Sequence, residues 1–170
     1  MTPATLGIAS DFVKTGIEKA GIPLTQTLEA YLSITFARFI GARITVDMLT
    51  VRINRAMDAN APRDAIRDLA DECLLACAFF EERLRRNGTI RHYVGLGQTA
   101  YDAAALTEQA YGFVHMRDVM ASAKASDGGD DGRVLLDRAR AGSGTARAEL
   151  DRQNVVIGPW GGASGGLLWR

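Results

Sequence analysis

The sequence predicts an all-α fold, a single-domain helical bundle of five to seven helices with a Gly-rich C-terminal tail. Apolar residues recur at spacings of three and four along most of the chain, which places them on one helix face, and strand patterns are scarce. The 170 residues suit one domain, and the 47% hydrophobic and 24% charged residues lie near globular averages. Together these observations favour a packed helical bundle.

The first two predicted helices are delimited by residues that favour helix ends. The first covers about residues 4–20 and ends before Gly21. The second starts near Thr25 or Thr27 and ends near Ile40. A broad apolar stripe, typical of a helix that packs on a core, runs along the second helix. It consists of Leu24, Leu28, Tyr31, Leu32, Phe36, Phe39 and Ile40.

A third helix is predicted over about residues 45–58, with Thr45 as its N-cap and Asp47 in its first turn. A fourth is predicted over about 62–87, with Pro62 in the first position. We expect this fourth helix to be the central core element, because its apolar residues repeat without interruption. They are Ile66, Leu69, Cys73, Leu74, Cys77, Phe80 and Leu84.

The remaining helical pattern supports a fifth helix over about 89–105 and a sixth over about 107–124, or one continuous kinked helix. Small residues on the fifth helix, Gly95, Gly97 and Ala100, would let a neighbouring backbone approach closely.

Composition divides the chain into three parts. We predict a bundle core over residues 1–125, a linker with short helices that pack on the core over 126–153, and a flexible tail over 154–170. The linker begins with the loop-forming residues SDGGDDG, and the tail is rich in glycine. Trp160 or Trp169 could anchor the tail on the body.

Charge and targeting signals indicate a cytoplasmic protein with little affinity for nucleic acid or membranes. Lys plus Arg equals Asp plus Glu at 20 each, so no long-range field attracts polyanions. No signal peptide is recognisable, and no apolar stretch is long enough for membrane insertion. Cys73 and Cys77 predict buried reduced thiols rather than a metal or redox pair, because zinc would need two more ligands.

Asp71 is the most informative polar residue, because its helix position borders the apolar stripe of the fourth helix. A carboxylate there needs hydrogen-bond donors, since desolvation alone would cost several kcal/mol. We expect Tyr101 to be the best placed donor, with Arg67 or Arg117 supplying positive charge. The preferred interpretation is a structural network, and the alternative is ligand capture.

The segment Arg83–Tyr93 is the one basic patch of the sequence. Its arginines and aromatic end suit a phosphate, nucleic acid or acidic partner, whereas a helix C-terminus favours positive side chains in any case. We favour the interpretation that these arginines only stabilise a helix C-terminus. We nevertheless keep residues of this segment and of the Asp71 network as candidates for binding a ligand or partner. The candidates are Asp71, Arg85, Arg86, Arg91, Tyr93 and Tyr101.

Motifs for catalysis, cofactors and metals are incomplete. The glycines around Leu96 lack the third glycine and the preceding strand of a dinucleotide fingerprint. The carboxylate pairs Asp71-Glu72 and Glu81-Glu82 have no histidine at di-metal spacing, so most of these carboxylates should be solvated partners of nearby arginines. The sequence therefore predicts no cofactor, no metal and no catalytic residue, and an enzyme is the less favoured class.

Residues 66–105 resemble a pattern found in an uncharacterised bacterial family of all-helical proteins, and DRARAGSGTARAEL at 137–150 is similar to its C-terminal part. Ala70 and Ala78 depart from the pattern, which has glycines there. The resemblance implies a helical fold and no known activity. The positions of the pattern are held here by Leu69, Ala70, Asp71, Leu74, Phe79 or Phe80, Glu82, Arg85, Arg86, Tyr93, Gly97, Ala100 and Tyr101.

The leading functional hypothesis is a non-enzymatic protein–protein interaction or adaptor protein, whose tail orders on an unknown protein partner. The alternative is a small-ligand-binding regulatory domain with a pocket near Asp71, Arg91, Tyr93 and Tyr101. An enzyme and a nucleic-acid binder rank below both, and homo-oligomerisation is left open.

Overall fold

The computed structural model of the protein describes residues 2–42, 44–124, 139, 143–152, 155–156 and 168–169, and the prediction of an all-α fold is confirmed. In the described part, β1 (Val155–Val156) and β2 (Leu168–Trp169) pair antiparallel. The helices are α1 (Pro3–Ala20), α2 (Gln26–Phe39), α3 (Leu49–Asp58), α4 (Arg63–Phe79), α5 (Glu81–Leu84), α6 (Ile90–Ala103), α7 (Thr107–Lys124) and α9 (Gly144–Arg152).

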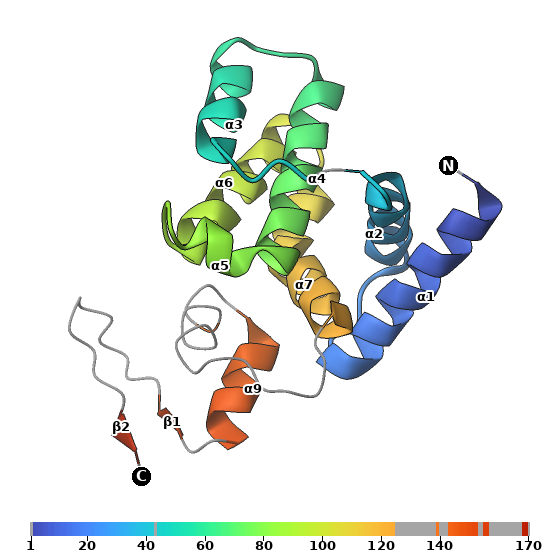
Figure 1. Cartoon of the computed structure of the whole chain (residues 1–170), viewed down its shortest axis with the longest axis vertical. Helices are drawn as coiled ribbons and strands as arrows, with labels where there is room; N and C mark the ends of the chain where they lie inside the picture. The colour runs from blue at the N-terminus through green and yellow to red at the C-terminus, as the bar shows by residue number, and fades with distance from the viewer. Residues whose placement is uncertain are drawn as a thin grey trace.

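Helix α4 is the centre of the bundle, as predicted. It packs against α3, α6 and α7, and every residue from 70 to 78 is buried. Helices α1 and α2 form an antiparallel hairpin that lies on the opposite side of the molecule from α3, and α1 packs along α7 (Figure 1). Side chains of α2 and α6 both reach α4, where they form one polar network.

The fourth helix is shorter than predicted. It ends at Phe79, because Phe80 adopts φ −128° and ψ 31°, and the separate single turn α5 follows. The expectation that Phe80 belongs to the core stripe is wrong, since its side chain is 39% exposed. The ring of Phe79 instead contacts those of Phe12 and Phe36, at centroid distances of 6.2 and 5.8 Å.

The exposure of Phe80 predicts different costs for truncating Leu74, inside α4, and Phe80, just after its end. Leu74→Ala removes a fully buried side chain and should lower the free energy of unfolding by about 2–5 kcal/mol. Phe80→Ala should cost less than about 1 kcal/mol, because its ring is already partly hydrated. Urea denaturation of both variants measures the two costs. Equal costs would contradict the observed break after Phe79.

The third helix also begins later than predicted, at Leu49, and Thr45 is not its N-cap. The backbone N–H of Thr45 instead donates to Glu72 Oε1 at 2.6 Å. Asp47 lies before the helix and accepts from Arg83 at 2.7 Å. Glu72 also pairs with Arg52 at 2.6 Å and is buried, so it is not the solvated carboxylate expected from sequence. The Thr45 bond joins the chain before α3 to α4, the Asp47 bond joins it to α5, and the Arg52 bond joins α3 itself to α4.

Helices α6 and α7 are separate, so the alternative of one kinked helix is wrong. The chain turns at Ala105, which has a positive φ of 61°. Its N–H donates to the carbonyl of Asp102, and the N–H of Leu106 donates to that of Tyr101. This pair of bonds is the Schellman arrangement that closes a helix C-terminus, usually with glycine at the position of Ala105.

Only part of the small-residue prediction holds. A Cβ at Gly97 would lie 2.3 Å from the ring of Phe113, so α7 does approach α6 closely there. A Cβ at Gly95 would meet no atom within 4 Å, so that glycine faces open space. Two further close approaches were missed: Gly16 lies against Val119 and Gly112 against Leu28.

The C-terminal predictions fall mostly outside the described residues. The SDGGDDG loop, residues 157–167 and Trp160 lie outside the described part. The proposed boundaries at residues 125 and 153 therefore stay predictions. Among the helices that the structure describes, none combines the length and apolarity that a bilayer crossing requires.

Candidate functional site

The side chain of Asp71 lies fully buried in the middle of α4 and binds side chains from two neighbouring helices. The hydroxyls of Tyr31 on α2 and Tyr101 on α6 both donate to its Oδ1 at 2.7 Å. Arg38 on α2 donates from Nη1 to its Oδ2 at 3.2 Å. One carboxylate therefore links three helices.

Helix geometry explains this convergence. Tyr31 and Arg38 are seven residues apart, or about two turns, so they lie on the same face of α2. Tyr101 occupies the last turn of α6, which packs against the same helix α4. The two tyrosine rings meet edge to face with centroids 6.0 Å apart, which fixes both hydroxyls beside the carboxylate.

A chain of ion pairs joins Asp71 to the surface. Arg38 also donates from Nη2 to Asp68 at 2.8 Å, one turn earlier on α4. Arg67 donates to the same oxygen of Asp68 at 2.9 Å and pairs with Asp64 at 3.2 Å. The exposed fraction rises along this series, from 0% at Asp71 to 48% and 85% at the side chains of Asp68 and Asp64.

The protonation equilibria follow the depth of each group. Burial raises the pKa of Asp71 even though two tyrosines and Arg38 stabilise its charge. Burial also raises the pKa of Tyr101, and the charge of Asp71 adds to that effect. Partial burial also acts to raise the pKa of Asp68. The guanidinium groups of Arg38 and Arg67 outweigh this effect and hold the pKa below its usual value.

The prediction that Tyr101 donates to a buried Asp71 is confirmed. The cation that binds Asp71 directly is Arg38, whereas Arg67 binds Asp64 and Asp68, and its charge still acts to lower the pKa of Asp71. Arg117 is buried beside Asp118, to which its Nε donates at 3.0 Å. Arg38 and Tyr31 were missed. Tyr31 appeared only as one member of an apolar stripe, and no local pattern marks Arg38 as the partner of a residue 33 positions away.

The other predicted site residues do not join this network. Tyr93 is buried in the core, and its backbone carbonyl faces the thiol of Cys73 at 3.4 Å. Tyr93 and Tyr101 are eight residues apart on α6, a rise of about 12 Å, so they do not line one pocket with Asp71. Arg85 and Arg86 lie beyond the end of α5, away from the middle of α4.

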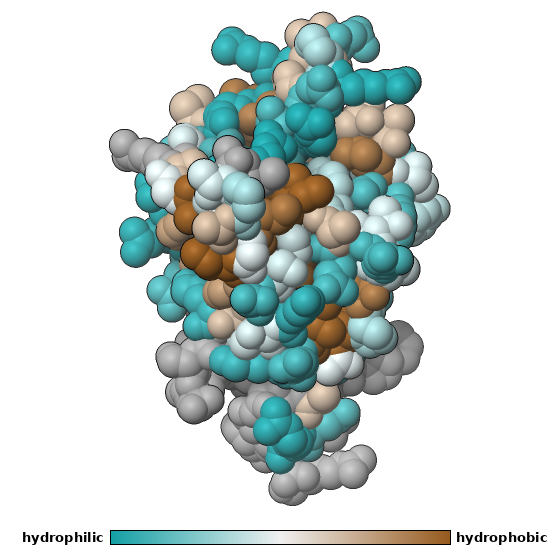
Figure 2. Space-filling view, turned by 90° about the vertical axis from the view of Figure 1, so that its right-hand side faces the viewer, coloured by the Kyte–Doolittle hydropathy of each residue, from teal (hydrophilic) through white to brown (hydrophobic). Residues whose placement is uncertain are grey.

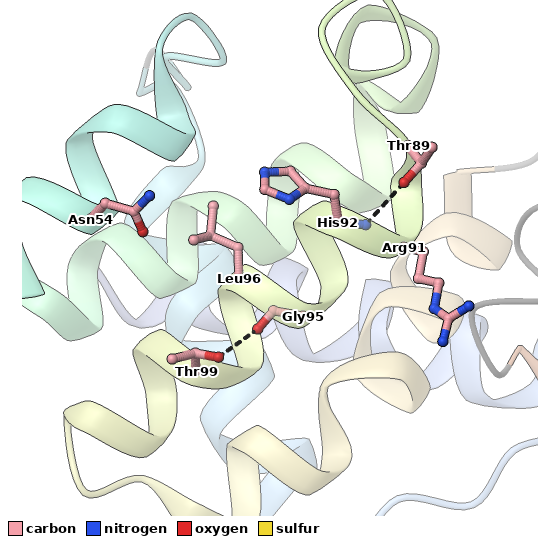
Figure 3. A pocket seen from close by; sticks show the side chains of 7 residues that line it. All are labelled: Asn54, Thr89, Arg91, His92, Gly95, Leu96 and Thr99. Atoms are coloured by element: carbon pink, nitrogen blue, oxygen red, sulfur yellow. Dashed lines mark hydrogen bonds between the residues drawn. The ribbon is translucent and has the colours of Figure 1, made fainter.

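Arg91 lines a different feature, an open depression of about 540 Å³ on the outer face of α6 (Figure 3). The backbone at Gly95 forms its middle, and Arg91 and His92 project to different sides of the helix. His92 Nε2 lies 3.0 Å from the hydroxyl of Thr50, which links this helix to α3. The lining residues are Asn54, Thr89, Arg91, His92, Gly95, Leu96 and Thr99.

Cys73 and Cys77 are free, buried thiols, as predicted. A hydrogen bond with Cys77, together with burial, raises the pKa of Cys73 well above its usual value, so the reactive thiolate is disfavoured. Within the part of the chain that is described, no three histidine, cysteine or carboxylate side chains gather in a group that could hold a metal ion.

A partly exposed apolar surface lies where α1, α2 and the end of α4 meet. Phe12 stacks on Phe36 with centroids 4.6 Å apart, and Phe79 contacts both rings. Because α1 and α2 are antiparallel, Ile8, one turn before Phe12, lies level with Ile40, one turn after Phe36. We call these five residues the aromatic face.

The aromatic face is accessible to solvent. Ile8 is 63% exposed and Ile40 is 39% exposed, while the three rings are half-buried or better covered. Figure 2 views the side of the molecule formed by α1 and α2 and shows apolar surface gathered between hydrophilic side chains. Contiguous apolar surface of this kind usually marks a contact site for another molecule.

Comparisons of the chain with protein-family models, curated proteins and solved structures found no match in any of the three.

Proposed function

We propose that this protein is a non-enzymatic interaction module that binds a partner protein through its aromatic face. The observation that carries the proposal is the exposure of Ile8 beside a stack of aromatic rings. Aromatic side chains surrounded by partly hydrated aliphatic ones supply the large apolar contacts that dominate binding energy at protein interfaces.

The shape of the face favours a helical segment of the partner. Two antiparallel helices with apolar side chains at the same level present a surface into which an amphipathic helix packs its own apolar residues. Ile8 and Ile40 supply aliphatic contacts at one end, and the three phenylalanine rings supply the rest.

The Asp71 network supports a structural role better than the alternative of ligand capture. Its Oδ1 already accepts two hydrogen bonds and its Oδ2 accepts one, and the side chain is fully buried. A ligand would have to displace these donors and enter between packed helices. We therefore propose that the network stabilises the packing of α2, which carries Phe36 of the aromatic face, rather than serving as a binding site.

We also propose that the protein works in the cytoplasm of a bacterium. Its two buried free thiols suit a reducing compartment, and its balanced charge offers no general attraction to nucleic acid. The bacterial source rests on the family resemblance alone.

The test compares two isoleucine replacements of the same kind. Ile8→Lys places a charge on the aromatic face, whereas Ile34→Lys changes an isoleucine that is 44% exposed on another face of α2. Tagged wild-type and variant chains are used to capture proteins from a bacterial host, and the affinity of the purified partner is measured by calorimetry. Ile8→Lys should weaken binding at least about tenfold, and Ile34→Lys should leave it unchanged.

Equal binding by both variants, or equal loss, would contradict a partner site on the aromatic face. Sedimentation equilibrium of the purified chain covers the case in which the partner is a second copy, because self-association should then be lost in Ile8→Lys alone. A chain truncated before residue 154 tests the tail separately. If only the truncation abolishes binding, the tail and not the aromatic face is the binding site.

A further inference from the structure

We infer that the depression around Gly95 binds a small organic anion, with its acidic group beside Arg91 and its apolar part on Leu96. This site is separate from the aromatic face, so the inference goes beyond the proposed function. It rests on three observations: an open depression of about 540 Å³, a polar lining that includes a guanidinium and, among the described residues, no acidic group, and a glycine that leaves the helix surface open.

The size of the hollow suits an organic molecule rather than a lone ion. Its volume of about 540 Å³ lies within the range of small-molecule sites. Gly95 has no side chain, and an added Cβ would meet nothing within 4 Å, so a ligand can rest directly on the helix at this position. Leu96, the next residue, supplies an apolar contact at the edge of the hollow.

The chemistry of the lining favours negative charge. Arg91 supplies a guanidinium, Asn54 an amide and His92 an imidazole, and none of the described residues that line the hollow is acidic. Figure 3 shows Arg91 on one side of the Gly95 backbone and His92 with Asn54 toward the other, so a ligand over Gly95 lies between these polar groups.

The two threonines of the hollow bind the backbone of α6. Thr89 caps α6 by accepting from the backbone N–H of His92 at 3.2 Å. Thr99 donates to the carbonyl of Gly95 at 2.9 Å.

The experiment titrates the full-length protein with phenyl phosphate, benzoate and neutral benzyl alcohol at constant ionic strength, observed through backbone amide NMR signals. We expect saturable shifts confined to residues 89–99 and Asn54 with at least one of the two anions, and none with benzyl alcohol. Comparison of phenyl phosphate with benzoate distinguishes phosphate from carboxylate ligands. Shifts with neither anion, or equal shifts with benzyl alcohol, would overturn the proposal.

Variants separate binding from folding. Gly95→Leu should fill the hollow and abolish the shifts, while the melting temperature rises by about 2–4 °C because leucine favours helix. Arg91→Gln should weaken the anion about tenfold. Lys14→Gln, on the exposed surface of α1, removes the same charge away from the hollow and should change nothing. Unchanged binding in Gly95→Leu would show that the anion binds elsewhere.

Discussion

Gly16→Ala is expected to lower the free energy of unfolding by about 3 kcal/mol, at the upper end of the cost of overpacking a core. The added methyl would lie 2.3 Å from the backbone oxygen of Val119 and 2.9 Å from its side chain. Because the obstacle is the backbone of α7, it cannot relieve the clash by changing rotamer. The two helices would have to move apart, and α1 has its most extensive contact with α7.

Gly7→Ala is the matched control on the same helix. A Cβ at Gly7 would meet nothing within 4 Å, so alanine should stabilise α1 by up to about 1 kcal/mol through its higher helix propensity. Chemical denaturation of both variants gives the two free energies. A neutral Gly16→Ala would mean that α1 does not pack on α7 at the observed distance.

Asp71→Asn is expected to cost about 2 kcal/mol at neutral pH. Asparagine keeps an oxygen for Tyr31 and Tyr101, but it loses the charge and turns an amide N–H toward Arg38. Tyr101→Phe removes one of the donors and should cost about 1 kcal/mol. Asp64→Asn is the control, since its carboxylate is 85% exposed, and should change stability by less than about 0.5 kcal/mol.

The raised pKa of Asp71 predicts how the stability difference between wild type and Asp71→Asn changes with pH. Because the pKa of folded Asp71 is raised, folding favours its protonated form, and its contribution to stability is largest below the ordinary pKa of 3.8. The contribution falls as the pH rises through the raised pKa. The stability difference between wild type and Asp71→Asn should therefore be larger near pH 4 than near pH 7. A difference that grows toward neutral pH would contradict a raised pKa.

Binding measurements on Asp71→Asn distinguish the structural role from ligand capture. If the network is structural, partner affinity falls only as far as the loss of folded protein explains, and the melting temperature falls with it. Selective loss of partner binding at an unchanged melting temperature would favour the ligand interpretation and contradict the one proposed.

The helical segments and the central position of α4 could be predicted from local patterns in the sequence. Apolar spacings of three and four residues follow from the period of a single helix. Signals for helix ends, such as Thr25 and Gly21, act within a few residues, so a short stretch of sequence is enough to recognise both. The position of Asp71 beside an apolar stripe was equally local. A buried carboxylate requires donors, and this requirement led correctly to Tyr101 on the next long helix.

The contacts between residues on different helices could not be predicted from the sequence. Arg38 rather than Arg67 donates a hydrogen bond to Asp71, and Gly16 rather than Gly95 lies against a neighbouring backbone. Phe79, the last residue of α4, contacts the other rings of the aromatic face, whereas Phe80 does not belong to the core stripe. Each outcome depends on the angle and the distance at which two helices cross, which the packing of all their side chains sets together. The residue pattern of one helix shows which face is apolar, but it does not show where the neighbouring helix lies.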